Sequence, residues 1–196
     1  MKRSNGFALL IFLAVVPLVS AVDLVSGISF FKRTVTSSDV STTSSTTFAT
    51  LANTVVIAPP GASQVSVRFS AESRCTELGG TAVNWCEMRV LINGIEAEPR
   101  ETVVGQDFAF DSTNGGNATS GSYEAHSMDR TDCVRNSTSA IQPVRVEVQY
   151  AVTNLDGGSA PTFWIDDSSL IVDVSQGCTV VPEGTTTTDL LNSVQQ

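Results

Sequence analysis

The chain has 196 residues, 41% hydrophobic and 16% charged, a length that suits one domain with its own core. Its formal net charge is −9, from 20 acidic and 11 basic residues. A phosphate backbone or an anionic lipid surface would repel such a chain on average, so composition argues against a nucleic-acid partner. Gly, Ser and Thr are frequent and no long window is rich in helix formers, which favours an all-β domain.

Residues 1–21 have the pattern of a secretory signal peptide. Met1-Lys2-Arg3 is a basic start, residues 7–19 are apolar, and Val19-Ser20-Ala21 offers the small residues that signal peptidase reads. The apolar run is too short for a comfortable membrane anchor. We therefore expect cleavage after Ala21, no membrane span in the mature chain, and a secreted or cell-surface protein.

A type IV pilin leader is the alternative interpretation of the same stretch. Gly6 follows the basic start, and residues 7–31 are mostly apolar, as in a leader with its retained helix. Pilins usually carry Glu at the fifth mature position, where this chain has Ile11. Under this alternative the protein would be a structural subunit of a surface filament.

Three regions are expected after the signal. Residues 22–50 are a Ser- and Thr-rich lead-in, which predicts a flexible or extended segment ahead of the folded domain. Residues 51–180 are expected to form the β-sandwich domain. Residues 181–196 are polar and predict a flexible tail.

Alternation of apolar and polar residues marks the first strands of this domain. Residues 54–57 are β-branched and end at the turn Pro59-Pro60-Gly61. Residues 65–72 then have an apolar side chain at every second position: Val65, Val67, Phe69 and Ala71. This is the pattern of a strand with one dry face and one wet face.

The later strands follow the same rule. Residues 86–92 alternate and lead into Asn93-Gly94, which predicts a type I′ hairpin returning at residues 95–98. Further strands are expected at residues 107–111, 122–128, 144–152, 162–165 and 170–174. These roughly eight to ten strands predict an antiparallel β-sandwich. Its common interior should contain Phe69, Val90, Val146 and Val148.

Four cysteines in an exported chain predict two disulfides, for which three pairings are possible. Cys75 ends one predicted strand and Cys86 begins the next, so a bridge between them would tie down the intervening loop. That pairing leaves Cys133 with Cys178. A zinc site is disfavoured, because no Cys-x-x-Cys pair is present and the chain has one histidine.

Several blocks of the sequence carry a family resemblance. They are Phe69-Ser70-Ala71-Glu72-Ser73 with Cys75, Cys86-Glu87-Met88-Arg89-Val90-Leu91-Ile92-Asn93-Gly94, Asp107-Phe108-Ala109-Phe110-Asp111-Ser112, Glu124-Ala125-His126-Ser127-Met128-Asp129-Arg130 and Ile165-Asp166-Asp167-Ser168-Ser169-Leu170. In this order they resemble a group of uncharacterised bacterial secreted β-domains, over residues 55–174. The resemblance implies a compact antiparallel sandwich, with a jelly roll as one form of it. It brings no established activity and transfers no catalytic residue.

His126 is the only histidine, and a serine and a carboxylate near it would suggest a catalytic triad. Ser127, Asp129 and Asp132 are close in sequence. Residues 126 and 127 of a strand point to opposite faces, however, so Ser127 is not its partner. The chain also lacks a Gly-x-Ser-x-Gly elbow. We therefore expect a histidine that is hydrogen-bonded at a sheet edge, and a protein that is more readily a binding module than an enzyme.

Acidic residues near the predicted strand ends suggest two further chemistries. Carboxylates near Asp166 would suit a hydrolase. The loop that starts at Asp111 offers oxygen ligands and glycines, so Asp111, Asn114 and Asn117 are a weak calcium candidate without the full EF-hand pattern. No other metal and no cofactor is expected.

The plain interpretation of two of these acids is structural. Asp166 and Asp167 would form a turn and pair with Arg130 or Arg145. Two sequons, at Asn117 and Asn136, would carry glycans in a host that uses them.

Aromatic side chains could also build a sugar-stacking platform. The candidates are Trp85, Trp164, Tyr123 and Tyr150. Trp164 lies among apolar residues and is expected in the core, and Trp85 is expected to pack on the disulfide of its neighbour Cys86.

The sequence thus predicts a secreted or cell-surface module that is non-enzymatic and binds an extracellular glycan or protein. The pilin-like subunit and the hydrolase near Asp166 are the alternatives. The residues assigned to ligand binding are Trp85, Glu124, His126, Asp129, Arg130, Asp166 and Asp167.

Overall fold

A computed structural model describes residues 30–77, 83–100, 108–113, 123–155 and 158–178. The strands are β1 (Phe30–Ser37), β2 (Ser41–Thr43), β3 (Ala49–Ala58), β4 (Gly61–Thr76), β5 (Trp85–Ile92), β6 (Ile95–Glu96), β7 (Ala109–Ser112), β8 (Glu124–Asn136), β9 (Gln142–Thr153) and β10 (Thr162–Gln176). Within these ranges, no helix is long and apolar enough to cross a membrane. The signal-peptide prediction and the polar tail lie outside the described residues. Of the helix that the pilin alternative predicts over residues 7–31, only Phe30 and Phe31 are described, and they belong to strand β1.

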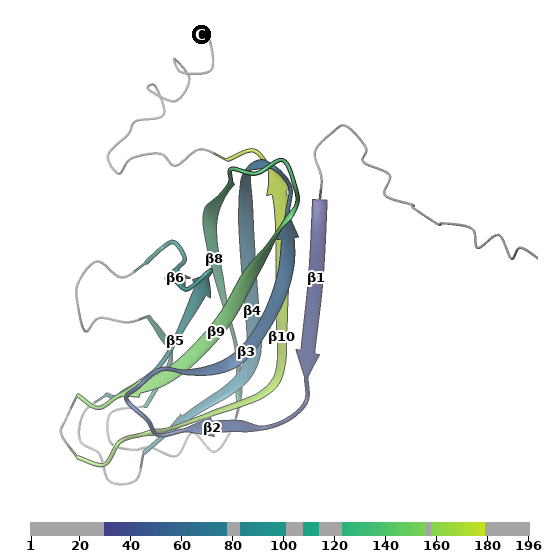
Figure 1. Cartoon of the computed structure of the whole chain (residues 1–196). Coiled ribbons are helices and arrows are strands. Elements are labelled where there is room, and N and C mark those ends of the chain that lie inside the picture. Colours follow the sequence, from purple (N-terminus) through teal and green to yellow (C-terminus); the bar gives the residue numbers. More distant parts are fainter. Residues whose placement is uncertain (1–29, 78–82, 101–107, 114–122, 156–157, 179–196) are drawn as a thin grey trace, which may run out of the picture.

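The strands form two antiparallel sheets packed against each other (Figure 1). Sheet A has the order β1-β10-β4-β8, with β2 also paired to β10. Sheet B has the order β3-β9-β5-β6, with β7 also paired to β5. The predicted all-β sandwich is therefore confirmed.

The strand order is that of a jelly roll. β1 pairs with β10, β3 with β9, β4 with β8, and β5 with both β6 and β7, as if one long hairpin had been rolled up. Pairing of β10 with β4 and of β9 with β5 completes the two sheets. Strands from opposite ends of the chain thus become neighbours, which places side chains far apart in sequence on one face.

The core lies between the two sheets. Burial in β4 alternates at nearly every residue, as expected when successive side chains of a pleated strand face opposite sides. The four residues predicted to share an interior belong to one fully buried cluster: Phe69, Val90, Val146 and Val148. That prediction is confirmed.

The Asn93-Gly94 turn forms as predicted. Both residues have positive φ, 52° and 82°, as a type I′ turn requires, and they join β5 to β6. The Asn93 side chain accepts a hydrogen bond of 2.9 Å from the Arg145 backbone N–H. The turn is thereby tied to the neighbouring strand β9.

The predicted segments 162–165 and 170–174 are parts of the single strand β10. Its register against β4 shifts between Asp166 and Ser169, and Asp167 has a positive φ of 43°. The irregularity is a β-bulge, which lets Ile165 and Leu170 both face the core. The expected turn at Asp166 and Asp167 is therefore a bulge inside a continuous strand.

The predicted lead-in was too long. Residues 30–37 and 41–43 are β1 and β2, both paired with β10, so the sandwich begins near Phe30 rather than at residue 51. Phe31 and Val35 pack against the core. Composition concealed these strands because Lys32, Thr34, Thr36 and Thr42 fill their outward positions, while the backbone of β10 supplies the pairing.

Both disulfides have the predicted pairing. Cys75 at the end of β4 is bonded to Cys86 in β5, so this bridge joins the two sheets. Cys133 of β8 is bonded to Cys178, just beyond β10. Disulfides form and persist in oxidising environments, which indicates such a compartment for this protein.

Candidate functional site

The outward side chains of sheet A form rows that cross the strands. Side chains directly opposite each other on neighbouring strands lie close enough to interact. One row joins Ser127, Ser70, Ser169 and Thr36, and another joins Asp129, Arg68, Ile171 and Thr34. The outer face of this sheet is therefore a band of hydroxyl groups next to a charged row.

A third row, which we call the outer row, consists of Tyr123, Arg74 and Trp164. Arg74 of β4 is paired with Trp164 of β10, and Tyr123 immediately precedes β8 on the other side. The Arg74 guanidinium carbon is 5.0 Å from the centre of the Tyr123 ring and 4.8 Å from that of Trp164. Both contacts are cation–π interactions, so the two rings hold the guanidinium in place.

Two buried donor atoms of the outer row have no acceptor among the described residues. Neither Arg74 Nε nor Trp164 Nε1 has a hydrogen-bond partner in the described part of the chain. In the adjacent row, Glu72 of β4 lies opposite Asp166 of β10. Rings, unpaired donors and carboxylate acceptors thus lie next to each other on one face.

Trp164 is consequently not the core residue that its apolar neighbours suggested. Phe163 and Ile165 point into the core and are fully buried. Period-two geometry turns residue 164 to the outer face. Tyr150 is on the core side instead, where burial raises its pKa and its hydroxyl donates to the Thr42 carbonyl at 3.1 Å. Trp85 begins β5 in the other sheet, so the four predicted aromatics do not form one platform.

His126 does meet a serine and carboxylates, though not those nearest in sequence. Its Nδ1 lies 2.8 Å from Ser73 Oγ, and Ser73 Oγ donates to Asp111 Oδ2 at 2.8 Å. Glu124 Oε2 lies 3.9 Å from His126 Nε2. We call Ser73, Asp111, Glu124 and His126 the His126 cluster. As predicted, His126 is hydrogen-bonded at a sheet edge, on strand β8.

A bulge in β7 brings Asp111 to this cluster. Cys86 pairs with Asp111 and Glu87 with Ala109, so Phe110 has no opposite residue. A bulge re-aims the side chains beside it. Phe110 accordingly packs in the core and contacts the His126 ring edge-on at 5.6 Å between centroids, while Asp111 reaches Ser73.

The His126 cluster does not have the geometry of a hydrolytic triad. Ser73 is 0% exposed, and its single hydroxyl proton is donated to Asp111, so His126 is the donor toward Ser73. In a triad the serine donates to the histidine and its oxygen is open to substrate. The cluster is instead a polar link between the two sheets.

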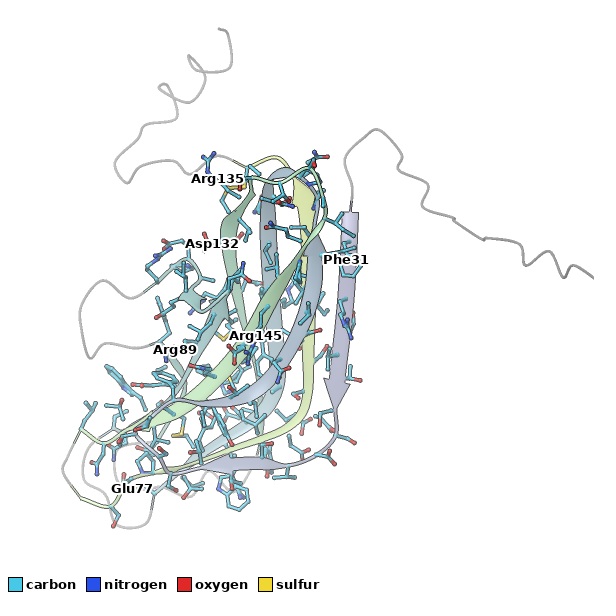
Figure 2. All side chains as sticks on the ribbon, viewed as in Figure 1. Phe31, Glu77, Arg89, Asp132, Arg135 and Arg145 are labelled. Atoms are coloured by element: carbon cyan, nitrogen blue, oxygen red, sulfur yellow. A yellow bond between two sulfur atoms is a disulfide. The ribbon has the colours of Figure 1, made fainter. Side chains whose placement is uncertain are left out.

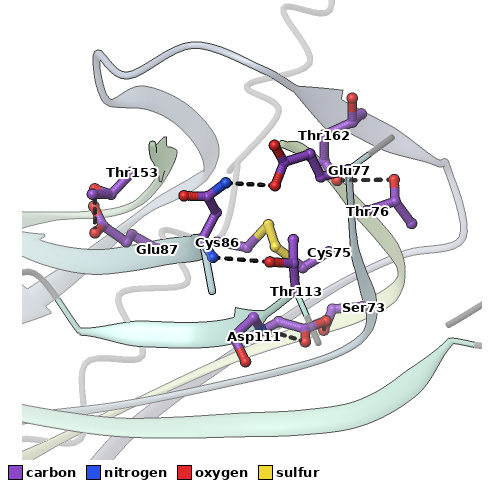
Figure 3. The surroundings of a disulfide bond; sticks show 12 residues. Ser73, Cys75, Thr76, Glu77, Cys86, Glu87, Asp111, Thr113, Thr153 and Thr162 are labelled. Carbon is purple, nitrogen blue, oxygen red and sulfur yellow. Dashed lines mark hydrogen bonds between the residues drawn. A yellow bond between two sulfur atoms is a disulfide. The ribbon is translucent and has the colours of Figure 1, made fainter. Parts of the chain in front are cut away.

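A second polar network surrounds the Cys75–Cys86 disulfide (Figure 3). The Asn84 amide donates to Glu77, and the Asn84 backbone N–H donates to Thr113 Oγ1 at 2.9 Å. Glu87 accepts from Thr153. Figure 2 shows Glu77 at the opposite end of the sandwich from Arg135. These buried acids could not be recognised from the sequence, because several of their partners come from segments far apart in the chain.

The other residues that were predicted to bind a ligand do not lie together. Asp129 on the outer face binds Arg68 at 2.8 Å, whereas Arg130 points inward and donates to the Asp129 carbonyl. Asp166 accepts from the Asp167 backbone N–H, and Arg145 pairs with Glu147. The predicted pairing of Asp166 and Asp167 with Arg130 or Arg145 is therefore wrong.

The described residues include only part of the predicted calcium site. Asp111 bonds to Ser73 and to the Ser112 backbone N–H, whereas Asn114 and Asn117 lie outside the described residues. Among the residues that the structure describes, no group of three His, Cys, Asp or Glu side chains is arranged to hold a metal ion.

The Asn136 sequon has a structural role. Asn136 is 3% exposed, and its amide donates to the carbonyls of Ala58, Pro59 and Ala140. Its oxygen accepts from the Thr138 backbone N–H and hydroxyl. This side chain ties together the β8–β9 and β3–β4 connections, so in the folded protein its nitrogen is not available to carry a glycan.

We expect Asn136→Asp to lower the free energy of unfolding by about 2 kcal/mol, because buried carbonyls lose their donor and face a carboxylate instead. Urea unfolding followed by circular dichroism measures the change. Asn53→Asp is the matched control, since Asn53 is exposed on β3. Equal stabilities of the two variants would contradict the structural role.

The chain matches no family model, and no curated protein is significantly similar to it. The resemblance to bacterial secreted β-domains therefore stays a prediction, and the functional argument depends on the geometry described above.

Proposed function

We propose that the protein is a secreted or cell-surface, non-enzymatic module that binds a glycan on the outer face of sheet A. The observation that carries this proposal is the outer row, in which two aromatic rings flank an arginine that has no acid partner among the described residues. Sugars offer apolar ring faces and many hydroxyl groups. Aromatic surface with a few convergent polar groups is the chemistry that suits them.

The neighbouring side chains support a hydroxyl-rich ligand over an apolar one. Glu72 and Asp166 accept hydrogen bonds, Arg74 donates them, and the Ser and Thr row does both. A protein partner is the alternative, but the outer-face side chains around the two rings are mostly polar, with Ile171 as an apolar exception. Export agrees with the proposal, because two disulfides suit an oxidising compartment.

We expect Trp164→Ala to weaken glycan binding at least tenfold, because it removes the larger ring and frees the Arg74 side chain that it holds. The measurement is a glycan array with a calcium chelator in parallel, followed by titration of the best glycan. Trp85→Ala is the matched control, since Trp85 is the only other tryptophan and lies in sheet B.

Intrinsic fluorescence gives a second readout. In Trp85→Phe, Trp164 is the sole tryptophan, so a saturable change in its emission on adding the glycan would place the ligand at the outer row. The proposal would be rejected if the native chain bound no glycan on the array. It would also be rejected if Trp164→Ala bound the glycan as tightly as the native chain.

A further inference from the structure

Arg130 is the only buried arginine or lysine in the described ranges, with 9% of its surface exposed. It extends inward from β8, beside the cleft where that edge of sheet A approaches β5 and β7 of sheet B. A buried cation loses several kcal/mol of hydration, and a partner anion usually compensates for that loss.

Within the described residues, no carboxylate forms a salt bridge with Arg130, although the charges of Glu96 and Asp129 act on it. Arg130 Nη1 donates to the Asp129 carbonyl at 2.8 Å, and Arg130 Nε has no hydrogen-bond acceptor. The Asp129 carboxylate, which is the adjacent acid, instead binds Arg68 at 2.8 Å. The Phe108 ring lies 4.3 Å from the guanidinium carbon and covers it without neutralising it.

The electrostatics agree with this description. Burial lowers the pKa of Arg130. The negative charges of Glu96 and Asp129 raise this pKa, but by less than burial lowers it. The guanidinium stays protonated, because an unperturbed arginine pKa is above 12. A charged, incompletely satisfied group therefore faces the interior of the cleft.

A cavity of about 270 Å³ adjoins Arg130. Sheet B contributes Met88, Ala109 and Phe110 to its lining, sheet A contributes Met128, and Phe108 precedes β7. Met88, Phe110 and Met128 are buried in the core, whereas Phe108 is exposed. Ser127 and Asp129 complete the lining. The cavity thus combines a largely polar surface with the exposed Phe108 ring and the buried cation of Arg130.

We propose that this cavity, the Arg130 pocket, binds a small monocarboxylic acid with an apolar body. The carboxylate is placed on the Arg130 guanidinium, which suits it in both charge and planar geometry. The body lies against the exposed Phe108 ring, next to the buried side chains of Met88 and Met128. Unbranched thioether side chains adapt to apolar groups of different shape, so the pocket should accept several short chains.

The size of the cavity sets the class of ligand. Pockets for drug-sized molecules measure about 300 to 1,000 Å³, and this one falls just below that range. A short-chain acid fits, whereas an oligosaccharide does not. The Arg130 pocket is therefore separate from the proposed glycan surface, and neither proposal depends on the other.

The methionines make a direct test. The chain has three, and two of them, Met88 and Met128, line the pocket. The full chain labelled with ¹³C at the methionine methyl groups is titrated with hexanoate, up to about 10 mM for a weak site. We expect saturable shifts of the Met88 and Met128 signals.

Two small molecules separate the contributions of charge and apolar body. Hexanamide keeps the chain and the shape but has no charge, and acetate keeps the charge but has no body. We expect each to bind at least tenfold more weakly than hexanoate, because a charge-assisted hydrogen bond and the apolar contacts are both needed. Equal binding of hexanamide and hexanoate, or no shift with hexanoate, would overturn the proposal.

Arg130→Met tests the residue itself, because methionine keeps much of the side-chain length without the charge. We expect it to weaken hexanoate binding at least tenfold. Arg135→Met is the matched control, since Arg135 lies on the same strand and is exposed. Unchanged hexanoate affinity in Arg130→Met would also overturn the proposal. If that variant does not fold, the comparison of hexanoate with hexanamide on the native chain decides.

Discussion

Phe163→Ala should lower the free energy of unfolding by about 3–5 kcal/mol, the range for deleting a buried aromatic ring. Phe163 is fully buried, and its ring centroid lies 6.2 Å from that of Phe110 and 6.1 Å from that of Tyr150. The backbone there is paired with β4 on one side and with β2 on the other, so the strands cannot collapse into the cavity. The cost should therefore lie toward the upper end of the range.

The next residue supplies the control. Trp164 has a larger side chain, but it faces outward and its main contact is Arg74. We expect Trp164→Ala to lower the free energy of unfolding by less than half as much as Phe163→Ala. Urea unfolding of both variants under the same conditions, with the slopes compared, measures the difference. Equal losses would mean that both faces of β10 are buried, contrary to the fold.

The alternation rule explains why the core could be predicted from the sequence. Phe69 and Val90 lie on strands whose polar and apolar residues alternate, and on a pleated strand this pattern assigns each side chain to a face. The same rule contradicts the prediction for Trp164. That prediction followed the hydrophobicity of neighbouring residues, whereas position along the strand turns residue 164 outward.

The candidate sites depend on register, which one sequence does not reveal. Trp164 meets Arg74 because β10 pairs with β4 at one specific offset. Asp111 meets Ser73 because of a bulge in β7. Predicting either contact requires knowledge of which strands are neighbours and where the ladder slips. The residue types were therefore visible in the sequence, while most of their partners were not.

The jelly roll also explains why the two proposed sites differ in chemistry. The outer row lies on the open face of a sheet, where a ligand stacks on side chains and stays partly hydrated. The Arg130 pocket lies between an edge of sheet A and sheet B, where the burial of Arg130 strengthens one charge interaction. The open face of sheet A therefore suits an extended sugar, whereas the Arg130 pocket suits a short acid.

Replacement of both Cys133 and Cys178 by serine should cost about 4 kcal/mol. The bridge closes a loop of 45 residues, and the loss of unfolded-state entropy for such a loop lies between about 3 kcal/mol for 15 residues and about 4.7 for 100. The bridge spans β4, because β8 and β10 are the two neighbours of that strand. It therefore anchors the edge strand β8, which carries both His126 and Arg130.

Comparison with the other disulfide separates chain entropy from packing. Cys75 and Cys86 close only 11 residues, so entropy alone predicts about 3 kcal/mol for their removal. Both of these sulfurs are in the core, however, and their loss also leaves a cavity. Cys133 and Cys178 are partly exposed, so their cost should be almost purely that of loop closure. Urea unfolding of the two double variants without reductant measures both costs, and no loss in Cys133→Ser/Cys178→Ser would contradict the anchoring role of that bridge.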